Sequence, residues 1–190
     1  MEKYPLTSAE LFDMTMEKRW TCGDCGHVII QDVPAEEAGH GIGLEVNLQQ
    51  PTRGLSLVEY LRTNVFEETL NIRCKDSKCK QSKRVSGKPR QRRKLITQTL
   101  EVLIVRLVRF AQEYRGASNT PIDIKIRDQC KYEEYLNLSE FTESGDPLPY
   151  QLDGVVAHNG KNVGGSHYIA GIREQKGKAF CCINDDVAIE

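Results

Sequence analysis

Two short pairs of cysteines, far apart in the chain, restrict the fold of this sequence more than any other feature. The pairs are Cys22 with Cys25 in CGDCG and Cys74 with Cys79 in CKDSKC. A glycine follows each cysteine of the first pair, where a tight turn is needed. Four thiolates complete the tetrahedral shell of zinc, so we predict that the pairs meet around one structural Zn²⁺. Two unconnected pairs of buried thiols are the alternative, and His27 is a weaker candidate ligand.

Charge and length narrow the classes of function. The chain has 190 residues, of which 26 are basic and 27 acidic, so no overall field attracts it to nucleic acid or to a membrane surface. No apolar run reaches the roughly 18 residues of a membrane-spanning helix, and the first residues lack the pattern of a signal peptide. Seven cysteines in such a chain indicate a reducing compartment. We therefore expect an intracellular protein of the cytoplasm or nucleus, with no membrane partner.

Periodic patterns predict the elements that surround the cysteine pairs. Residues 43–48 alternate as a strand with one apolar face. The segment SLVEYL begins a helix with Ser56 as its N-cap, and Glu59 completes a capping box. Residues 99–110, TLEVLIVRLVRF, carry apolar side chains on both faces, which predicts a central, buried strand. A shorter strand is predicted at 122–126.

A basic run separates the second cysteine pair from the predicted central strand. Residues 83–94 hold seven basic residues in twelve, interrupted by glycine and proline. A nucleic-acid-binding segment is one interpretation, but no aromatic residues interleave to stack on bases. We interpret the run as the solvated part of a long hairpin that continues into Leu95 and Ile96, and nucleic acid is not an expected partner.

Residues 150–190 have the pattern of paired strands joined by glycine-rich turns. The predicted strands are 152–157, 167–173 and 179–183. If the second and third are antiparallel, the start of one lies beside the end of the other, which brings His167 next to Asn184 and Asp185. An imidazole held by an amide or a carboxylate is the base half of a nucleophilic triad. A structural or solvated histidine is the alternative.

These segments resemble the ubiquitin-specific proteases, a family of cysteine-dependent deubiquitinases. Four stretches match the family's histidine box in order, namely Tyr150 with Leu152, 158–160, 165–168 and 183–185. VLIVRLVRF at 102–110 is similar to a strand of the family, although Arg106 and Val108 replace its usual histidine and lysine. LNLSEF at 136–141 and both cysteine pairs also occur at the family's places.

The resemblance implies a fold and a set of roles. His167 would be the general base, Asn184 the residue that orients it, and Asp185 a neighbouring carboxylate that assists. The implied class is α+β, mostly antiparallel β, with the fingers and palm of a papain-like cysteine peptidase but without its helical thumb. Residues 1–97 would form zinc-bearing fingers, and residues 98–190 the palm with the histidine box.

Two features of the family have no counterpart in this sequence. These are the Gly-x-Thr-Cys-Tyr box that carries the nucleophile and the Tyr-x-Leu-x-Tyr closing strand that follows the Asn-Asp pair. The remaining cysteines do not replace the nucleophile, because Cys130 lies in a charged loop while Cys181 and Cys182 are fixed on a strand.

We therefore expect a fragment of a deubiquitinase that cleaves at the ubiquitin C-terminal glycine and is inactive alone. Its expected partners are ubiquitin, ubiquitinated proteins and a thumb segment supplied in cis or in trans. The alternative is a non-catalytic zinc-containing module that binds ubiquitin or another protein.

Overall fold

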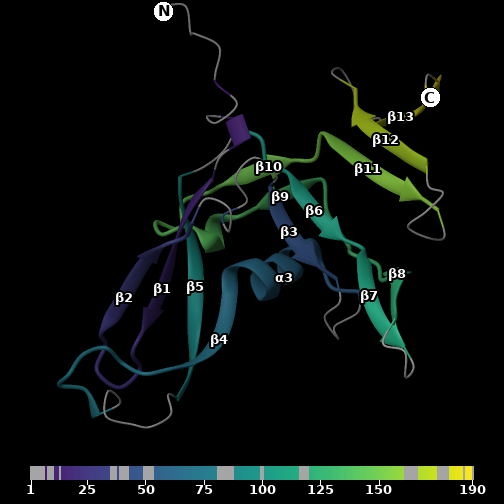
Figure 1. Ribbon diagram of the computed structural model, residues 1–190. Coiled ribbons are helices and arrows are strands. Elements are labelled where there is room, and N and C mark those ends of the chain that lie inside the picture. Colours follow the sequence, from purple (N-terminus) through teal and green to yellow (C-terminus); the bar gives the residue numbers. More distant parts are fainter. Residues whose placement is uncertain are drawn as a thin grey trace, which may run out of the picture.

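Antiparallel strands make up most of the computed structural model of this chain (Figure 1). The structure describes residues 7, 11–12, 14–34, 38, 43–48, 54–80, 88–98, 101–115, 120–160, 167–174, 180–185 and 187–189. The helical elements in these ranges are short, and the predicted class, α+β with mostly antiparallel β, is confirmed. None of the helices in these ranges has the length and apolar character needed to cross a membrane.

The first sheet, called the fingers sheet below, lies at the lower left of Figure 1. Its strands lie in the order β2 (Val28–Asp32), β1 (Thr15–Thr21), β5 (Lys88–Gln98) and β4 (Glu67–Ile72). Both β1 and β4 are antiparallel to β5, so they run in the same direction and end at the same edge. Cys22 follows β1 and Cys74 lies two residues after β4, so this edge carries both cysteine pairs.

The basic run lies mainly on β5, an inner strand of the fingers sheet. Arg92 forms an ion pair with Glu68 of β4, and Arg93 Nε lies 3.6 Å from Glu67 Oε1 of the same strand. The expected hairpin exists between β4 and β5, but β5 also pairs with β1 on its other side. Residues 83–87, at the start of the run, lie outside the described residues.

The strand predicted at 43–48 forms β3 (Leu44–Asn47), and its apolar face is buried as the alternation predicts. Leu44, Val46 and Leu48 are at most 2% exposed. The side chains of Tyr60 and Leu61, from α3 (Leu57–Leu61), belong to the same buried cluster. Burying apolar side chains of this size is the main favourable contribution to folding here.

The start of α3 confirms the predicted capping box. Ser56 Oγ accepts a hydrogen bond from the Glu59 backbone N–H at 3.3 Å, and the Glu59 carboxylate accepts one from the Ser56 N–H at 2.8 Å. The chain continues as a π-helical turn, η1 (Arg62–Phe66). The Phe66 ring stacks on the ring of Phe141 with centroids 4.0 Å apart, and this joins the helical segment to the second half of the chain.

The strand predicted at 99–110 is wrong in extent and in surroundings. Strand β6 covers only Val105–Val108 and pairs in parallel with β3 alone among the described strands. Val102 and Ile104 are 42% and 41% exposed instead of buried, and residues 99–100 lie outside the described residues. A break at Arg109 separates β6 from β7 (Phe110–Arg115), which forms a hairpin with β8 (Thr120–Lys125).

The second large sheet, called the histidine sheet below, lies at the upper right of Figure 1. Its antiparallel strands are β11 (Gly154–Asn159), β12 (His167–Arg173), β13 (Phe180–Asn184) and β14 (Val187–Ile189). Strand β12 has the predicted bounds, whereas β11 starts and ends two residues later than predicted. The expected absence of a closing strand is wrong, because β14 pairs with β13 although it lacks the family's aromatic pattern.

A small two-stranded sheet joins the two halves of the chain. It consists of β9 (Tyr135–Asn137) and β10 (Pro149–Gln151), with the 3-10 turn η3 (Ser139–Phe141) between them. Leu138 and Phe141 of this segment are fully buried beside α3 and β3. A single buried cluster thus contains residues from before and after residue 97. The division of the chain into fingers at 1–97 and a palm at 98–190 stays a prediction.

Candidate metal centre and histidine site

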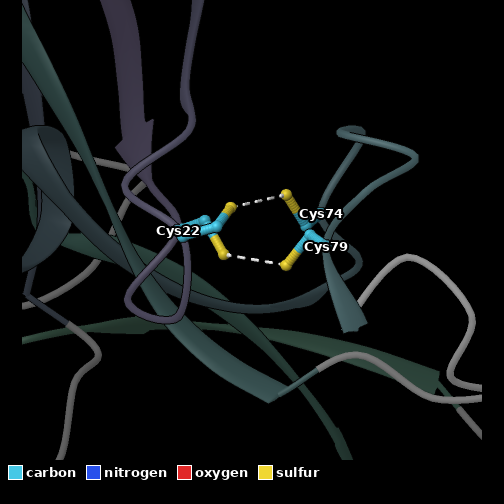
Figure 2. A group of neighbouring side chains, drawn as sticks. Cys22, Cys74 and Cys79 are labelled. Atoms are coloured by element: carbon cyan, nitrogen blue, oxygen red, sulfur yellow. Dashed lines mark hydrogen bonds between the residues drawn. The ribbon is translucent and has the colours of Figure 1, made fainter.

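The four cysteines of the predicted zinc site come together at the edge of the fingers sheet. Their Sγ atoms all lie within 4.8 Å of one another. Cys22 Sγ lies 3.8 Å from Cys79 Sγ, and Cys25 Sγ lies 3.7 Å from Cys74 Sγ. Figure 2 shows Cys22 on one loop and Cys74 and Cys79 on the loop that faces it. A tetrahedral zinc ion with Zn–S bonds of about 2.3 Å requires S···S edges of about 3.8 Å. The donor set and its spacing therefore fit one zinc ion.

Local hydrogen bonds shape the two loops that carry these cysteines. The Cys22 N–H donates to the His27 carbonyl and the Gly26 N–H to the Cys22 carbonyl, both at 2.8 Å. Gly26 has a φ of 70°, which explains the glycine at this turn. In the second loop the Cys79 N–H donates to the Asp76 carbonyl at 3.0 Å. His27 contributes its backbone, and its ring is not among the ligand group found in the described residues.

The surroundings lower the pKa of Cys22, whereas burial and the neighbouring thiols raise the pKa of Cys25 and of Cys74, so Cys22 becomes a thiolate most readily. Burial acts to raise the pKa of Cys22, but hydrogen bonds from the backbone of Asp24 and Cys25 lower it, and the net pKa is about 6. Cys22, Cys74 and Cys79 are at most 5% exposed, while Cys25 is exposed. Thiolates packed this closely repel one another unless a cation lies between them.

His167 and Asn184 lie together at one end of the histidine sheet. In the pairing of β12 with β13, Ala170 faces Ile183, so Asn184 lies opposite the residue two positions after His167, on the same face. His167 Nε2 is in hydrogen-bond contact with Asn184 Oδ1. Asp185 Oδ1 lies 3.8 Å from the same ring nitrogen. All three predicted site residues are therefore adjacent.

The contact with Asn184 determines which ring nitrogen of His167 could act as a base. An amide oxygen only accepts hydrogen bonds, so Nε2 carries the proton and donates it. In the neutral imidazole, Nδ1 then keeps its lone pair. Within the part of the chain that the structure describes, Nδ1 has no hydrogen-bond partner. The His167 side chain is 42% exposed, so a reacting group could reach this nitrogen.

The chain turns directly after Asn184, at Asp185. Asp185 has a φ of 53°, in the left-handed region, and the chain turns there into β14. The Asp185 side chain is 77% exposed. At 3.8 Å from Nε2 it contributes charge near the imidazole instead of a direct hydrogen bond.

The other three cysteines are poorly placed to act with His167. Burial raises the pKa of Cys130, which is 9% exposed, and this disfavours its thiolate. Cys181 and Cys182 face Ile172 and Gly171 across the β12–β13 pairing. Those positions are four or five residues beyond His167, which corresponds to roughly 13 Å or more along the strand.

Comparison with known proteins places the chain in a family. The family model of ubiquitin carboxyl-terminal hydrolases matches residues 2–190. The chain belongs to this family. Ubiquitin carboxyl-terminal hydrolase 25 of Arabidopsis thaliana is 26% identical over 183 residues, which cover 95% of this chain and 25% of that protein. Ubiquitin carboxyl-terminal hydrolase 42 of Homo sapiens is 28% identical over 138 residues, covering 72% of this chain and 9% of that protein. The chain thus spans a quarter or less of the length of these curated relatives.

Solved structures of the family share the fold of this chain. A SAGA DUB module bound to monoubiquitin has a TM-score of 0.69 at 20% identity, covering 96% of this chain and 37% of that chain. A second SAGA DUB module, bound to ubiquitin aldehyde, has a TM-score of 0.68 at 20% identity, covering 96% of this chain and 38% of that chain. This likeness confirms the predicted fold of the family's catalytic domain.

The structure also reveals a polar contact that no sequence pattern indicates. Lys125, at the end of β8, donates hydrogen bonds to the end of β11, close to His167. The segment IDIKI alternates as an ordinary strand, and its lysine is indistinguishable from a solvated one. Only the approach of two distant hairpins gives this lysine its partners.

Proposed function

We propose that this chain provides the general base, its orienting residue and the zinc-bearing fingers of a cysteine-type deubiquitinase. The observation that carries the proposal is the His167–Asn184 contact, which directs Nε2 toward the amide oxygen and leaves Nδ1 of the neutral ring to accept a proton, on a side chain that is 42% exposed. Membership of the ubiquitin carboxyl-terminal hydrolase family supports the same reaction class. The bond cleaved is the one that follows the C-terminal glycine of ubiquitin.

The proposed chemistry uses His167 twice. A cysteine thiol placed at Nδ1 transfers its proton to that nitrogen, and the resulting thiolate attacks the carbonyl carbon of the glycine. The imidazolium then returns the proton to the departing amine, which leaves a thioester. Water then attacks the thioester carbonyl as Nδ1 accepts a proton from it, and the imidazolium returns that proton to the departing thiolate, so that the thiol and free ubiquitin are released. Asn184 keeps the ring and its tautomer fixed throughout.

We propose further that the nucleophile comes from outside these 190 residues. Four cysteines form the metal group, Cys130 is buried with a raised pKa, and Cys181 and Cys182 pair with distant positions of β12. The chain alone is therefore inactive in this proposal. A thumb segment with a cysteine box, in cis or in trans, completes the enzyme.

Zinc has a structural role in this proposal. The residues that would hold it are Cys22, Cys25, Cys74 and Cys79. Four protein ligands leave no open coordination position, so such an ion holds the ends of β1 and β4 together and activates no water.

Ubiquitin and ubiquitinated proteins are the proposed partners. The two similar DUB modules are bound to monoubiquitin and to ubiquitin aldehyde. In this chain an open hollow of about 760 Å³ lies on the fingers sheet, lined among others by Arg19, Trp20 and Glu143. A surface of this kind suits binding of ubiquitin or another protein with or without turnover, and binding without turnover is the second candidate function.

A ubiquitin probe with a cysteine-reactive C-terminal group separates these candidates. The chain alone should remain unlabelled, and addition of a thumb segment with a cysteine box should produce labelling on that segment. His167→Ala in the mixture should slow the labelling, because the thiolate then lacks its base. Binding of unmodified ubiquitin with no labelling under either condition would favour the second candidate.

A further inference from the structure

Lys125 makes an unusually complete set of contacts for a lysine near the molecular surface. Its Nζ lies 2.9 Å from His158 Nδ1, 2.9 Å from the His158 carbonyl oxygen and 2.8 Å from the Gly160 carbonyl oxygen. An ammonium group has three N–H donors and no acceptor. Each donor therefore has one partner, and His158 Nδ1 must be the acceptor.

The two carbonyl groups flank the residue that faces His167. In the pairing of β11 with β12, Asn159 lies opposite His167 and His158 lies opposite Tyr168. These are the last pairs of β11 and the first residues of β12. Lys125 thus binds the carbonyl groups of the residues before and after Asn159, at the end of the pairing where His167 begins.

Aromatic contacts hold the His158 ring between two other elements. Its centroid lies 5.1 Å from the Phe110 ring at the start of β7 and 5.1 Å from the Tyr168 ring on β12, both in edge-to-face geometry. Because successive strand residues point to opposite faces, His158 and Tyr168 lie on the face opposite Asn159 and His167. The β7–β8 hairpin therefore supports the histidine sheet from behind His167.

We propose that Lys125 is a positioning residue for His167, a role that rests on the function proposed above. The terminal pairs of a strand pairing open most easily, and opening here would displace the His167 backbone relative to Asn184. Hydrogen bonds from an ammonium group are stronger than neutral ones, so two of them to carbonyl groups suit this anchoring. Lys125 touches neither ring nitrogen of His167 and acts through Asn159.

The test reads the histidine rings directly and requires no enzymatic activity. The 190-residue chain is labelled with ¹⁵N-histidine, and its four histidines are observed through their ring nitrogens and protons. In the unaltered chain, His158 and His167 should both carry their proton on Nε2, and the His167 proton should exchange slowly with water. These signals report the Lys125 contact and the Asn184 contact separately.

Lys125→Met should change both signals. His158 should lose its single tautomer, and exchange of the His167 Nε2 proton should accelerate by on the order of tenfold, since the anchoring contact is lost. The matched control is Arg127→Met, which removes an exposed cation two residues further along and should change neither signal. His158→Phe keeps an aromatic ring at this position and leaves the backbone carbonyl groups of residues 158 and 160 in place. The His167 Nε2 proton should therefore stay protected from exchange.

The outcomes separate this role from the proposed function. If Lys125→Met folds and His167 exchange is unchanged, the positioning role is wrong, while the His167–Asn184 pair and the proposed function stand. If the variant does not fold, Lys125→Gln, which keeps one donor, is expected to give a smaller acceleration, and no acceleration refutes the role. Fast exchange at His167 in the unaltered chain would overturn the proposed function itself.

Discussion

The cysteine group and the histidine site both lie at the ends of strands, but they differ in how completely their ligand atoms are used. Four thiols face one point at the edge of the fingers sheet, three of them are buried, and a tetrahedral ion would leave no open position. His167 is 42% exposed and has one ring nitrogen without a partner among the described residues. A metal site in which protein ligands fill every coordination position is typical of a stabilising role. A side chain with an accessible, unpaired nitrogen is typical of a group that exchanges protons with a substrate. We therefore expect changes at the first to alter stability and changes at the second to alter rate.

The largest effect is expected from removing one metal ligand. Cys74→Ser should reduce the zinc content from one per chain to nearly none and abolish cooperative melting of the fingers sheet. In small zinc domains the binding free energy, on the order of 10 kcal/mol, is available for folding, and this is comparable to the whole stability of a domain. Elemental analysis and thermal melting followed by circular dichroism measure the two effects.

Cys181→Ser is the matched control, because this half-buried cysteine lies outside the metal group. It should keep the zinc and the melting curve. Well under one zinc per chain in unaltered protein purified without chelator would show that the four cysteines do not form a zinc site. The stabilising role that we assign to them would then be wrong.

The second effect is expected at the base. In the chain completed by a thumb segment, His167→Ala should lower turnover of a ubiquitin conjugate by roughly 10²–10⁴-fold, the usual contribution of a general base. Zinc content and melting temperature should not change, because the ring is half-exposed and its strand, β12, lies in the histidine sheet, on the other side of the molecule from the fingers sheet (Figure 1). Labelling of the unassisted chain by the ubiquitin probe at one of its own cysteines would show that the nucleophile is wrongly assigned to an external segment.

A smaller loss of rate is expected from Asn184→Ala in the same completed enzyme. The variant keeps the base but frees its ring, and misplacement of about 1 Å can cost on the order of 10²-fold. Asn184→Asp retains an acceptor oxygen toward Nε2 and should recover most of the rate. Measuring kcat and KM separately tests this role. A loss in kcat is expected for a residue that orients the base, whereas a change in KM alone would indicate that Asn184 binds substrate.

His158→Ala should have a smaller effect on rate than either change. The variant keeps the backbone carbonyl groups that Lys125 binds and removes only the ring. Turnover of the completed enzyme measures it against His167→Ala under identical conditions. A loss as large as that of His167→Ala would mean that His158 itself contributes to the chemistry.

The sequence predicted the parts of both sites that depend on local pattern. The four cysteines, the bounds of β12 and the Ser56 capping box follow from spacing and periodicity. The segment 99–110 was predicted wrongly, because apolar residues on both faces do not reveal which neighbours are present. There Gly43 passes so close to Ile104 that an added Cβ would lie 2.1 Å from its carbonyl oxygen, a contact between distant segments.

Long-range polar contacts were the second kind of feature beyond prediction. The bond from Lys125 to the end of β11 joins two hairpins, and nothing in the order of residues near either partner encodes it. The tautomer of His167 likewise depends on Asn184 Oδ1, whose position results from the pairing of β12 with β13. Periodicity identifies the strands, while their packing determines the chemistry.

The smallest expected effect is at a position that belongs to neither site. Ser56→Ala removes the side-chain acceptor for the Glu59 N–H and should cost about 1 kcal/mol of stability.

The same change should alter how stability depends on pH. Hydrogen bonds from the Ser56 backbone and side chain lower the pKa of the Glu59 carboxyl, so the folded state binds a proton at Glu59 less readily than the unfolded chain does. The stabilisation by Glu59 is therefore present above the pKa of the unfolded state and is lost as pH falls through the folded value. Ser56→Ala should weaken this acid dependence, measured by urea unfolding at several pH values. Zinc content and probe labelling of the completed enzyme should stay unchanged, because α3 belongs to the shared core, whereas Cys22, Cys74 and Cys79 form a separate buried cluster and His167 belongs to neither among the described residues. A loss of zinc or of labelling in this variant would show that the two sites are coupled through the core, and the separation of stability from rate would not hold.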